Sequence, residues 1–213
     1  MLARLHSFCT IRIALIFLLP ALAACSSLTV RGGTECASGG GIVCGVATNA
    51  GPVTGMVVHA VDARGNWADS ALTDLNGRFR VDGRKLTPPY LVTVAANDPD
   101  GSPILLSSIV RDSLQTHVVV SPASSLIVQA ASGGEMIAPV RGDVLENDRF
   151  ADARLLEAER RFSKQLAPVL REFGIQETTD WFTLGLDDRL VMSVRIERLL
   201  AVVPIRVKAG IRS

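Results

Sequence analysis

Histidine and cysteine are the side chains best suited to acid–base, nucleophilic or metal chemistry, and both are scarce here: three His and four Cys occur in 213 residues. His59 and His117 each lie within a predicted strand, and nothing in the sequence places a nucleophile or second metal ligand beside them. The chain contains no G-x-S-x-G elbow, H-E-x-x-H pair or phosphate-binding loop. We therefore expect structural or surface histidines, and we predict no catalytic residues, no cofactor and no metal site.

The first 24 residues have the layout of a secretory signal peptide. A positive start with Arg4 and Arg12 precedes an apolar run over 13–19 and a stretch of small residues. The apolar run is shorter than the roughly 20 residues of a transmembrane helix. Two alternatives to lipoprotein processing stay open: ordinary cleavage at the A-x-A sequence 21–23, which would release a soluble protein, or an uncleaved anchor.

The residues at the end of this segment favour lipidation. They resemble the lipobox of bacterial lipoproteins and are Leu22, Ala23, Ala24 and Cys25. The resemblance implies that diacylglycerol is attached to the Cys25 thiol, that cleavage removes 1–24, and that a fatty acid such as palmitate acylates the new amino terminus. Ser26 follows where Asp would indicate inner-membrane retention. This favours the outer membrane of a Gram-negative cell, on its periplasmic or surface face.

Cys36 and Cys44 are the cysteines that remain after this processing. Disulfides persist in oxidising compartments, and residues 37–43 contain enough Gly and Ser to close a small loop. Two cysteines without a neighbouring His or third Cys cannot complete a tetrahedral zinc shell. We predict a Cys36–Cys44 disulfide that stiffens the entry to the first strand, with free thiols as the alternative.

Acidic residues form three groups that bear on metal binding. The stretch 97–101, Asn-Asp-Pro-Asp-Gly, has oxygen ligands at alternate positions. It lacks the distal Glu and the spacing of an EF-hand loop, so a turn is preferred over a calcium site. We expect the pairs Asp62/Asp69 and Asp187/Asp188 to be solvated loop or capping residues.

Composition favours a globular protein. The chain is 48% hydrophobic and 20% charged, and its net charge of +1 gives no electrostatic basis for binding nucleic acid. Aromatic residues make up only 5% of the chain, which limits stacking surfaces for bases or sugars. Trp67 and Tyr90 are the candidate ligand platform in the first domain.

Residues 42–120 consist of short apolar runs separated by turn signals, after a Gly/Ser-rich tether over 25–41. Phe79 and Val81 alternate with charged residues, as in a half-buried strand. Seven such runs predict a seven-stranded antiparallel sandwich. The expected strands are 42–47, 55–62, 67–73, 78–82, 90–96, 103–109 and 115–120. The expected core residues are Val46, Val58, Phe79, Val92, Val94 and Val119.

The same region resembles the carboxypeptidase regulatory-like domain, a transthyretin-like β-sandwich. The resemblance rests on Gly-Pro-Val-Thr-Gly-Met-Val-Val over 51–58, Thr-Asp-Leu-Asn-Gly-Arg-Phe over 73–79 and Tyr-Leu-Val-Thr-Val over 90–94. It covers 42–96 well and 97–120 loosely, and Met56 stands where the family prefers Ala. It implies an accessory module without the enzyme's zinc ligands. Another immunoglobulin-like sandwich is the alternative fold.

Residues 121–213 are predicted to be mainly helical. A short helix is expected over 122–131, with Ser or Pro at its start and Gly133 near its end. A long amphipathic helix is expected over 151–173, kinked or split at Pro168 and ended by Gly174. Its apolar stripe is Leu155, Ala158, Phe162, Leu166, Val169, Leu170 and Phe173. Two interpretations stay open for residues 175–213, a further hairpin or the start of a larger domain. For 186–210 both helix and strand stay open.

These features predict a non-enzymatic, envelope-anchored lipoprotein. The sandwich over 42–120 is expected to fold alone as a structural or recognition module. Residues 121–213 are expected to pack beside it or to dock an envelope protein. A carbohydrate- or peptidoglycan-binding module is the alternative, because related sandwiches bind glycans. An unrecognised extracytoplasmic enzyme is a less favoured interpretation.

Overall fold

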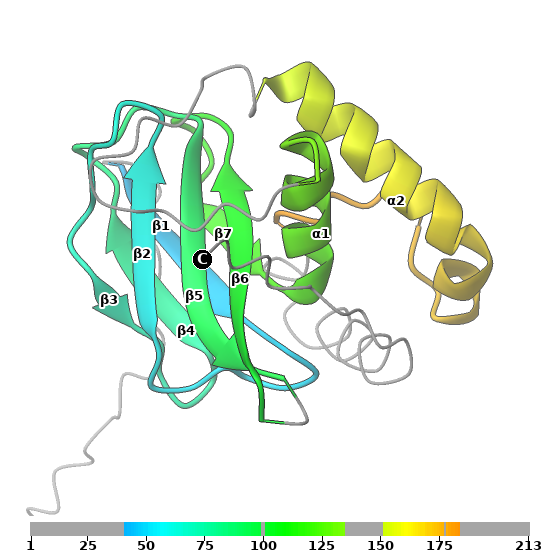
Figure 1. Cartoon of the computed structure of the whole chain (residues 1–213), viewed down its shortest axis with the longest axis horizontal. Helices are drawn as coiled ribbons and strands as arrows, with labels where there is room; N and C mark the ends of the chain where they lie inside the picture. Colours follow the sequence, from blue (N-terminus) through cyan, green and yellow to red (C-terminus); the bar gives the residue numbers. More distant parts are fainter. Residues whose placement is uncertain (1–40, 99–100, 135–150, 177, 184–213) are drawn as a thin grey trace, which may run out of the picture. The chain divides into compact units, whose positions relative to one another are not determined.

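The computed structural model describes residues 41–98, 101–134, 151–176 and 178–183. Within them the chain is mainly β, with seven strands in two sheets and two helices (Figure 1). The strands are β1 (Ile42–Ala47), β2 (Val57–Asp62), β3 (Ala71–Leu72), β4 (Arg78–Asp82), β5 (Tyr90–Asn97), β6 (Pro103–Val110) and β7 (His117–Val120). The helices are α1 (Pro122–Ala131) and α2 (Asp152–Glu172). The mainly β class agrees with the sequence prediction.

The three-stranded sheet has the order β4-β1-β7, and one of its pairs is parallel. β1 runs antiparallel to β4 but parallel to β7, so the prediction of a wholly antiparallel arrangement is wrong. β6 and β7 are consecutive yet belong to different sheets, and β7 therefore reaches β1 after the chain has crossed between them. This pairing joins Gly45 to Val118. No local turn signal in the sequence encodes such a distant partner.

The four-stranded sheet has the order β3-β2-β5-β6 and is antiparallel throughout. The edge strand expected over 67–73 is reduced to β3. Trp67 makes only an isolated bridge to Val61, and the exposed Asp69 and Ser70 separate that bridge from β3. The other predicted strands agree with the structure to within two residues at each end.

A cluster of buried apolar side chains from both sheets fills the space between them. Four of the expected core residues belong to it: Val58, Phe79, Val92 and Val94. The expectation for Val46 is wrong, because β1 turns Val43 and Ala47 towards this cluster and Val46 towards the opposite face. Val119 is buried as expected, but it lies on the outer side of its sheet.

Two glycines allow Phe79 to enter this core. Gly77 has φ of +71°, a left-handed conformation that glycine adopts without steric cost. Its position brings the chain into β4 with Phe79 facing inward. Gly45 lies beneath the ring, since a Cβ atom at that position would be 2.1 Å from Phe79 Cζ.

Both helices agree closely with the sequence prediction. Ser121 caps α1 and forms a reciprocal capping box with Ser124, while Pro122 occupies the first turn. α2 continues through Pro168 as a single helix, so the expected split does not occur, and Gly174 follows its end with φ of +64°.

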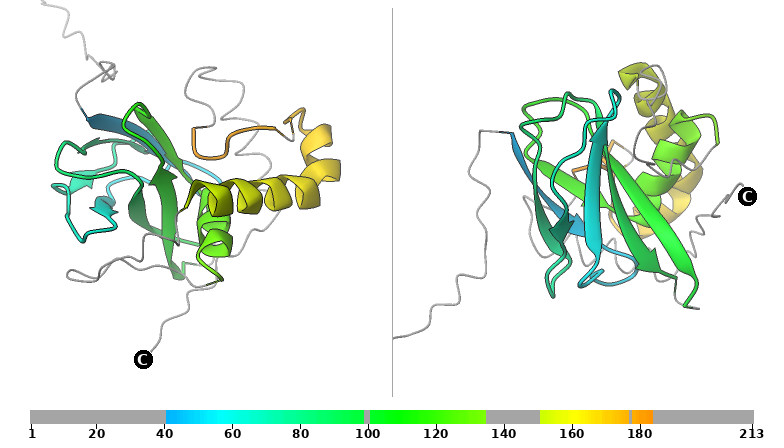
Figure 2. Two further views of the ribbon diagram at one scale, coloured as in Figure 1. Left: turned by 90° about the horizontal axis from the view of Figure 1, so that it is seen from above. Right: turned by 60° about the vertical axis from the view of Figure 1, so that its left-hand side comes forward.

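A second apolar cluster joins the helices to the outer face of the four-stranded sheet. Val61, Leu91 and Ile109 project from β2, β5 and β6 into this cluster, together with the apolar stripe of α2 and with Ile127 of α1. The partner of the amphipathic stripe is therefore this chain itself. Figure 2 shows α1 beside the sheet and α2 next to α1. Residues 186–210 and the pair Asp187/Asp188 lie outside the described residues.

Candidate functional site

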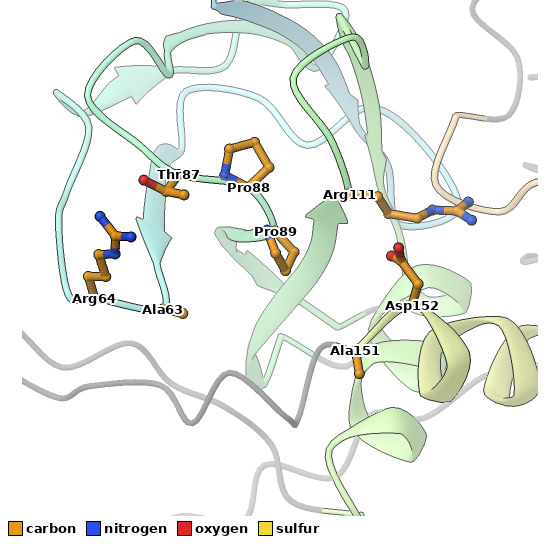
Figure 3. A pocket seen from close by; sticks show the side chains of 8 residues that line it. All are labelled: Ala63, Arg64, Thr87, Pro88, Pro89, Arg111, Ala151 and Asp152. Atoms are coloured by element: carbon orange, nitrogen blue, oxygen red, sulfur yellow. The ribbon is translucent and has the colours of Figure 1, made fainter.

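A pocket of about 360 Å³ lies at one end of the four-stranded sheet. We call it the sheet-end pocket. β2, β5 and β6 are antiparallel neighbours, so the residues after β2, before β5 and after β6 lie together at one end of the sheet. The start of α2 completes the wall of the pocket. Its lining residues are Ala63, Arg64, Thr87, Pro88, Pro89, Arg111, Ala151 and Asp152. Figure 3 shows Arg64 and Thr87 on one side and Arg111 and Asp152 on the other, with the prolines between them.

Asp62 links the segment after β2 to the segment before β5, which form two walls of this pocket. Its carboxylate is fully buried. Oδ1 accepts hydrogen bonds from the backbone N–H groups of Arg64 and Asn66, and Oδ2 accepts from the Asn66 amide and the Thr87 N–H, all at 2.9–3.0 Å. Burial acts to raise the pKa of Asp62, but these four donors outweigh it and the pKa is lowered. Asp62 is buried rather than solvated, but it caps the turn that follows β2, in agreement with the capping role expected for it, and Asp69 is exposed as expected.

Arg111 connects the pocket to α2 and to the segment that follows it. Its guanidinium lies 2.7 Å from Asp180 and 3.8 Å from Glu159, and it stacks 4.9 Å from the centre of the Phe182 ring. Glu159 also accepts the backbone N–H of Trp181 at 2.8 Å. Burial raises the pKa of Glu159, partly opposed by the Trp181 N–H and by Arg111. The Arg111 charge is therefore largely neutralised by protein carboxylates.

The remaining polar groups of the sheet-end pocket are suited to binding rather than to group transfer. Arg64 supplies an exposed guanidinium and Thr87 a hydroxyl, while Asp152 supplies a carboxylate opposite them. With Arg111 already paired, the charges of Arg64 and Asp152 balance. Such a pocket can offer donors and acceptors to a neutral or zwitterionic polar ligand, with the rings of Pro88 and Pro89 as an apolar surface.

A second concave surface lies between the helices and encloses about 690 Å³. Leu126 and Ala130 of α1 face Ala158 and Phe162 of α2 across it. On the α2 side, Glu157 forms ion pairs with both Arg160 and Arg161. Arg154 also lines this surface, so the charged residues on its α2 side are two arginines and one glutamate, and this rim is net positive.

The structure separates the two aromatic residues expected to form a ligand platform. Tyr90 is only 4% exposed and belongs to the core between the sheets, where burial raises its pKa strongly. Trp67 is half-buried, and its ring packs edge-to-face against His59 at 5.7 Å. Because the Tyr90 ring has no exposed face, the two residues do not form one surface.

The other candidate residues lie apart from the sheet-end pocket. His59 Nδ1 lies 3.3 Å from the Ser70 hydroxyl, and His117 Nδ1 lies 2.9 Å from the Thr116 hydroxyl. Cys44 lies in β1, whereas its expected partner Cys36 and the lipobox residues 22–25 lie in the part of the chain that is not described. The disulfide and the lipidation therefore remain predictions.

Of the stretch 97–101, the structure describes Asn97, Asp98 and Gly101, and residues 99–100 lie outside the described part of the chain. Gly101 donates its N–H to Asp98 O, and Asp98 donates its N–H to Ser102 O, both at 2.8 Å. Among the described residues, no group of three or more His, Cys, Asp or Glu is arranged to hold a metal ion. Of the described helices, neither combines the length and apolarity that crossing a membrane requires.

The sequence did not reveal that Asp62, Arg111 and Glu159 are the polar residues that shape this end of the molecule. Asp62 ends the apolar strand β2 and precedes Ala-Arg-Gly-Asn, a context in which an Asx side chain caps a turn, so a signal existed. Arg111, Glu159 and Trp181 are far apart in sequence, and nothing local predicts that they meet. No protein-family model, no curated protein sequence and no solved structure matches this chain.

Proposed function

We propose that this protein is a non-enzymatic bacterial lipoprotein that presents a folded recognition or structural module at the cell envelope. In this proposal residues 1–24 are a signal peptide, Cys25 carries the lipid, and 25–41 form the tether. The outer membrane is the proposed location, on its periplasmic or surface face. Its partner would be an envelope protein or an envelope glycan.

The observation that carries this proposal is the spacing between the lipobox and the fold. Cys25 directly follows the small residues Ala23 and Ala24, and the first strand begins at Ile42 after a stretch rich in Ser and Gly. A lipid-anchored module needs this order of signal, lipidated cysteine, spacer and folded unit.

For the folded unit we propose a seven-stranded sandwich of the transthyretin-like type. Two sheets with one shared core support this proposal, as do the positive φ of Gly77 and the inward position of Phe79. The parallel β1–β7 pair is a feature that any family assignment must accommodate.

Replacement of Cys25 by Ser tests the proposal. The variant is expected to accumulate as the unprocessed precursor and to take up no labelled palmitate, while the wild type is processed and labelled. Cys9→Ser is the matched control, because Cys9 lies within the proposed signal peptide and is not needed for lipid attachment. Equal processing of wild type and Cys25→Ser would contradict the proposal.

Glycan or peptidoglycan binding is the second candidate function, and the sheet-end pocket is the observation that favours it. Its donors, single carboxylate and proline rings suit a sugar or a short peptide better than an anion. The lipoprotein in detergent is expected to co-sediment with purified peptidoglycan, and Arg64→Ala to weaken this at least about fivefold. Lys85→Ala is the control, since Lys85 is exposed but does not line the pocket. Equal retention of all three proteins would exclude this pocket as the site.

A further inference from the structure

The concave surface between α1 and α2 is an open groove with an apolar floor, and we call it the interhelix groove (Figure 2). Side chains of both helices form the floor, among them Leu126 and Ala130 of α1 and Ala158 and Phe162 of α2. Leu126 and Phe162 are only half-buried, and Ala130 is exposed. These apolar groups therefore stay accessible to a ligand, as they do in small-molecule sites.

The dimensions of the interhelix groove suit a narrow ligand. Its lining residues on α2 extend from Ala153 to Gln165, which corresponds to a length of about 18 Å at the helical rise. The enclosed volume of about 690 Å³ is within the range of roughly 300–1,000 Å³ that is usual for small-molecule sites. A second helix of the same length, about 10–12 Å wide with its side chains, would fill roughly 1,400–2,000 Å³. The groove thus fits an extended chain better than it fits the helix of a partner protein.

The charged residues of the groove lie on α2, and they are unequally neutralised. Glu157 pairs with Arg160 and Arg161, and the hydrogen bond from Arg161 lowers the pKa of Glu157, so this carboxylate is ionised. Of the carboxylates in the described part of the chain, none forms an ion pair with Arg154. Asp152, close to it in sequence, lines the sheet-end pocket instead. Arg154 is exposed and belongs to the first turn of α2, where the helix dipole is also positive.

We propose that the interhelix groove binds an anionic amphiphile with a single apolar chain, such as a long-chain fatty acid. The carboxylate contacts the guanidinium of Arg154, which can donate two parallel hydrogen bonds to it. The apolar chain runs along α2 from Ala153 towards Phe162 and covers the floor of the groove. This binding goes beyond the proposed envelope role, and it does not depend on lipidation of Cys25.

Equilibrium dialysis with dodecanoate at pH 8, where the carboxylate of this ligand is ionised, tests the proposal. The protein is the chain 25–213 with Cys25→Ser, which includes every described residue and needs no detergent that would compete for the groove. Dodecanoate is expected to bind saturably and at least about tenfold more tightly than butanoate, whose chain is too short to cover the apolar floor. Dodecyltrimethylammonium has the same chain and the opposite charge, and it is expected to bind at least about threefold more weakly than dodecanoate.

Two substitutions with matched controls locate the ligand. Ala130→Phe fills the groove from an exposed position and is expected to weaken dodecanoate binding at least about tenfold, whereas Ala130→Ser should leave it unchanged. Arg154→Gln is expected to weaken binding about threefold. Lys164→Gln is the control for charge, because Lys164 is exposed on the same helix and does not line the groove. Circular dichroism shows whether each variant keeps the wild-type fold.

Trp181 supplies a second measurement that needs no substitution in the groove. Its ring packs edge-to-face against Phe162 with the centroids 5.1 Å apart, and the chain has one other tryptophan, Trp67. In a W67F background, dodecanoate is expected to change the emission of Trp181 with the same midpoint as in dialysis.

Three results would overturn the proposal. The first is an absence of saturable dodecanoate binding. The second is equal affinity of the wild type and of either Ala130→Phe or Arg154→Gln for dodecanoate. The third is a wild-type dimer in sedimentation velocity that Ala130→Phe dissociates, since this would assign the groove to a second copy of the chain.

Discussion

Replacing Asp62 by Asn tests how far one buried carboxylate supports the sheet-end pocket. In the wild type Oδ1 and Oδ2 each accept two hydrogen bonds. Asn retains one oxygen, which can still accept hydrogen bonds from the backbone N–H groups of Arg64 and Asn66. Its amide group would face the Thr87 N–H and the Asn66 amide, so two bonds are lost and donors oppose donors. Because a hydrogen bond to a charged group contributes about 1.5–3 kcal/mol and water reaches the exposed Thr87, we expect a loss of roughly 2–4 kcal/mol.

Urea unfolding at pH 7, followed by circular dichroism, measures this loss. Asp69→Asn is the matched control, because Asp69 is exposed on the same loop, and its effect is expected to stay within about 0.5 kcal/mol. The slope of the unfolding free energy against urea concentration should be unchanged in both variants.

The pH dependence follows from the lowered pKa of Asp62. A carboxylate with a folded-state pKa below its unfolded value of about 3.9 stabilises the fold above that value, and the contribution is lost as pH falls through the folded-state pKa. The stability difference between wild type and Asp62→Asn should therefore be constant near neutral pH and shrink below about pH 4. A variant within about 0.5 kcal/mol of wild type at pH 7, or a difference that does not change down to pH 3, would refute this role of Asp62.

Three further changes probe the helical side of the fold. Trp181→Ala should cost about 3–5 kcal/mol in urea unfolding, since the ring is 1% exposed, and a loss below about 1 kcal/mol would contradict its place in the second cluster. The stability of Glu159→Gln relative to the wild type should increase as pH rises from 4 to 8. The raised folded-state pKa of Glu159 stabilises the wild type at low pH, and this contribution is lost as pH rises through that pKa. Parallel curves of stability against pH for the two proteins would contradict this. The fragment 42–120 should unfold cooperatively but bind more hydrophobic dye than 42–183, because Val61, Leu91 and Ile109 lose their cover. Equal dye binding by the two fragments would show that the helices do not cover this face.

Local features of the sequence predicted local features of the fold. Alternation placed Phe79 in the core, and the capping residues of α1 and Gly174 after α2 located the helix ends. Alternation failed at Val46, because Val43 and Ala47 on the opposite face are also apolar and the register alone decides which set is buried.

The candidate site was far less predictable. The sheet-end pocket combines segments that follow β2, precede β5, follow β6 and begin α2, and its charge balance depends on Arg111 meeting Glu159 and Asp180. These contacts depend on how the helices pack against the sheet, which no short-range pattern encodes. The parallel pairing of β1 with β7, which sets His117 beside Cys44, is non-local for the same reason.

The intact mass of the protein isolated from bacterial membranes tests the central claim most directly. A lipid-anchored protein should begin at Cys25, carry the mass of a diacylglycerol and an amide-linked fatty acid, and partition into the detergent phase. A soluble protein that begins at Ala24, without added lipid, would show ordinary cleavage after Ala23 and would contradict the account.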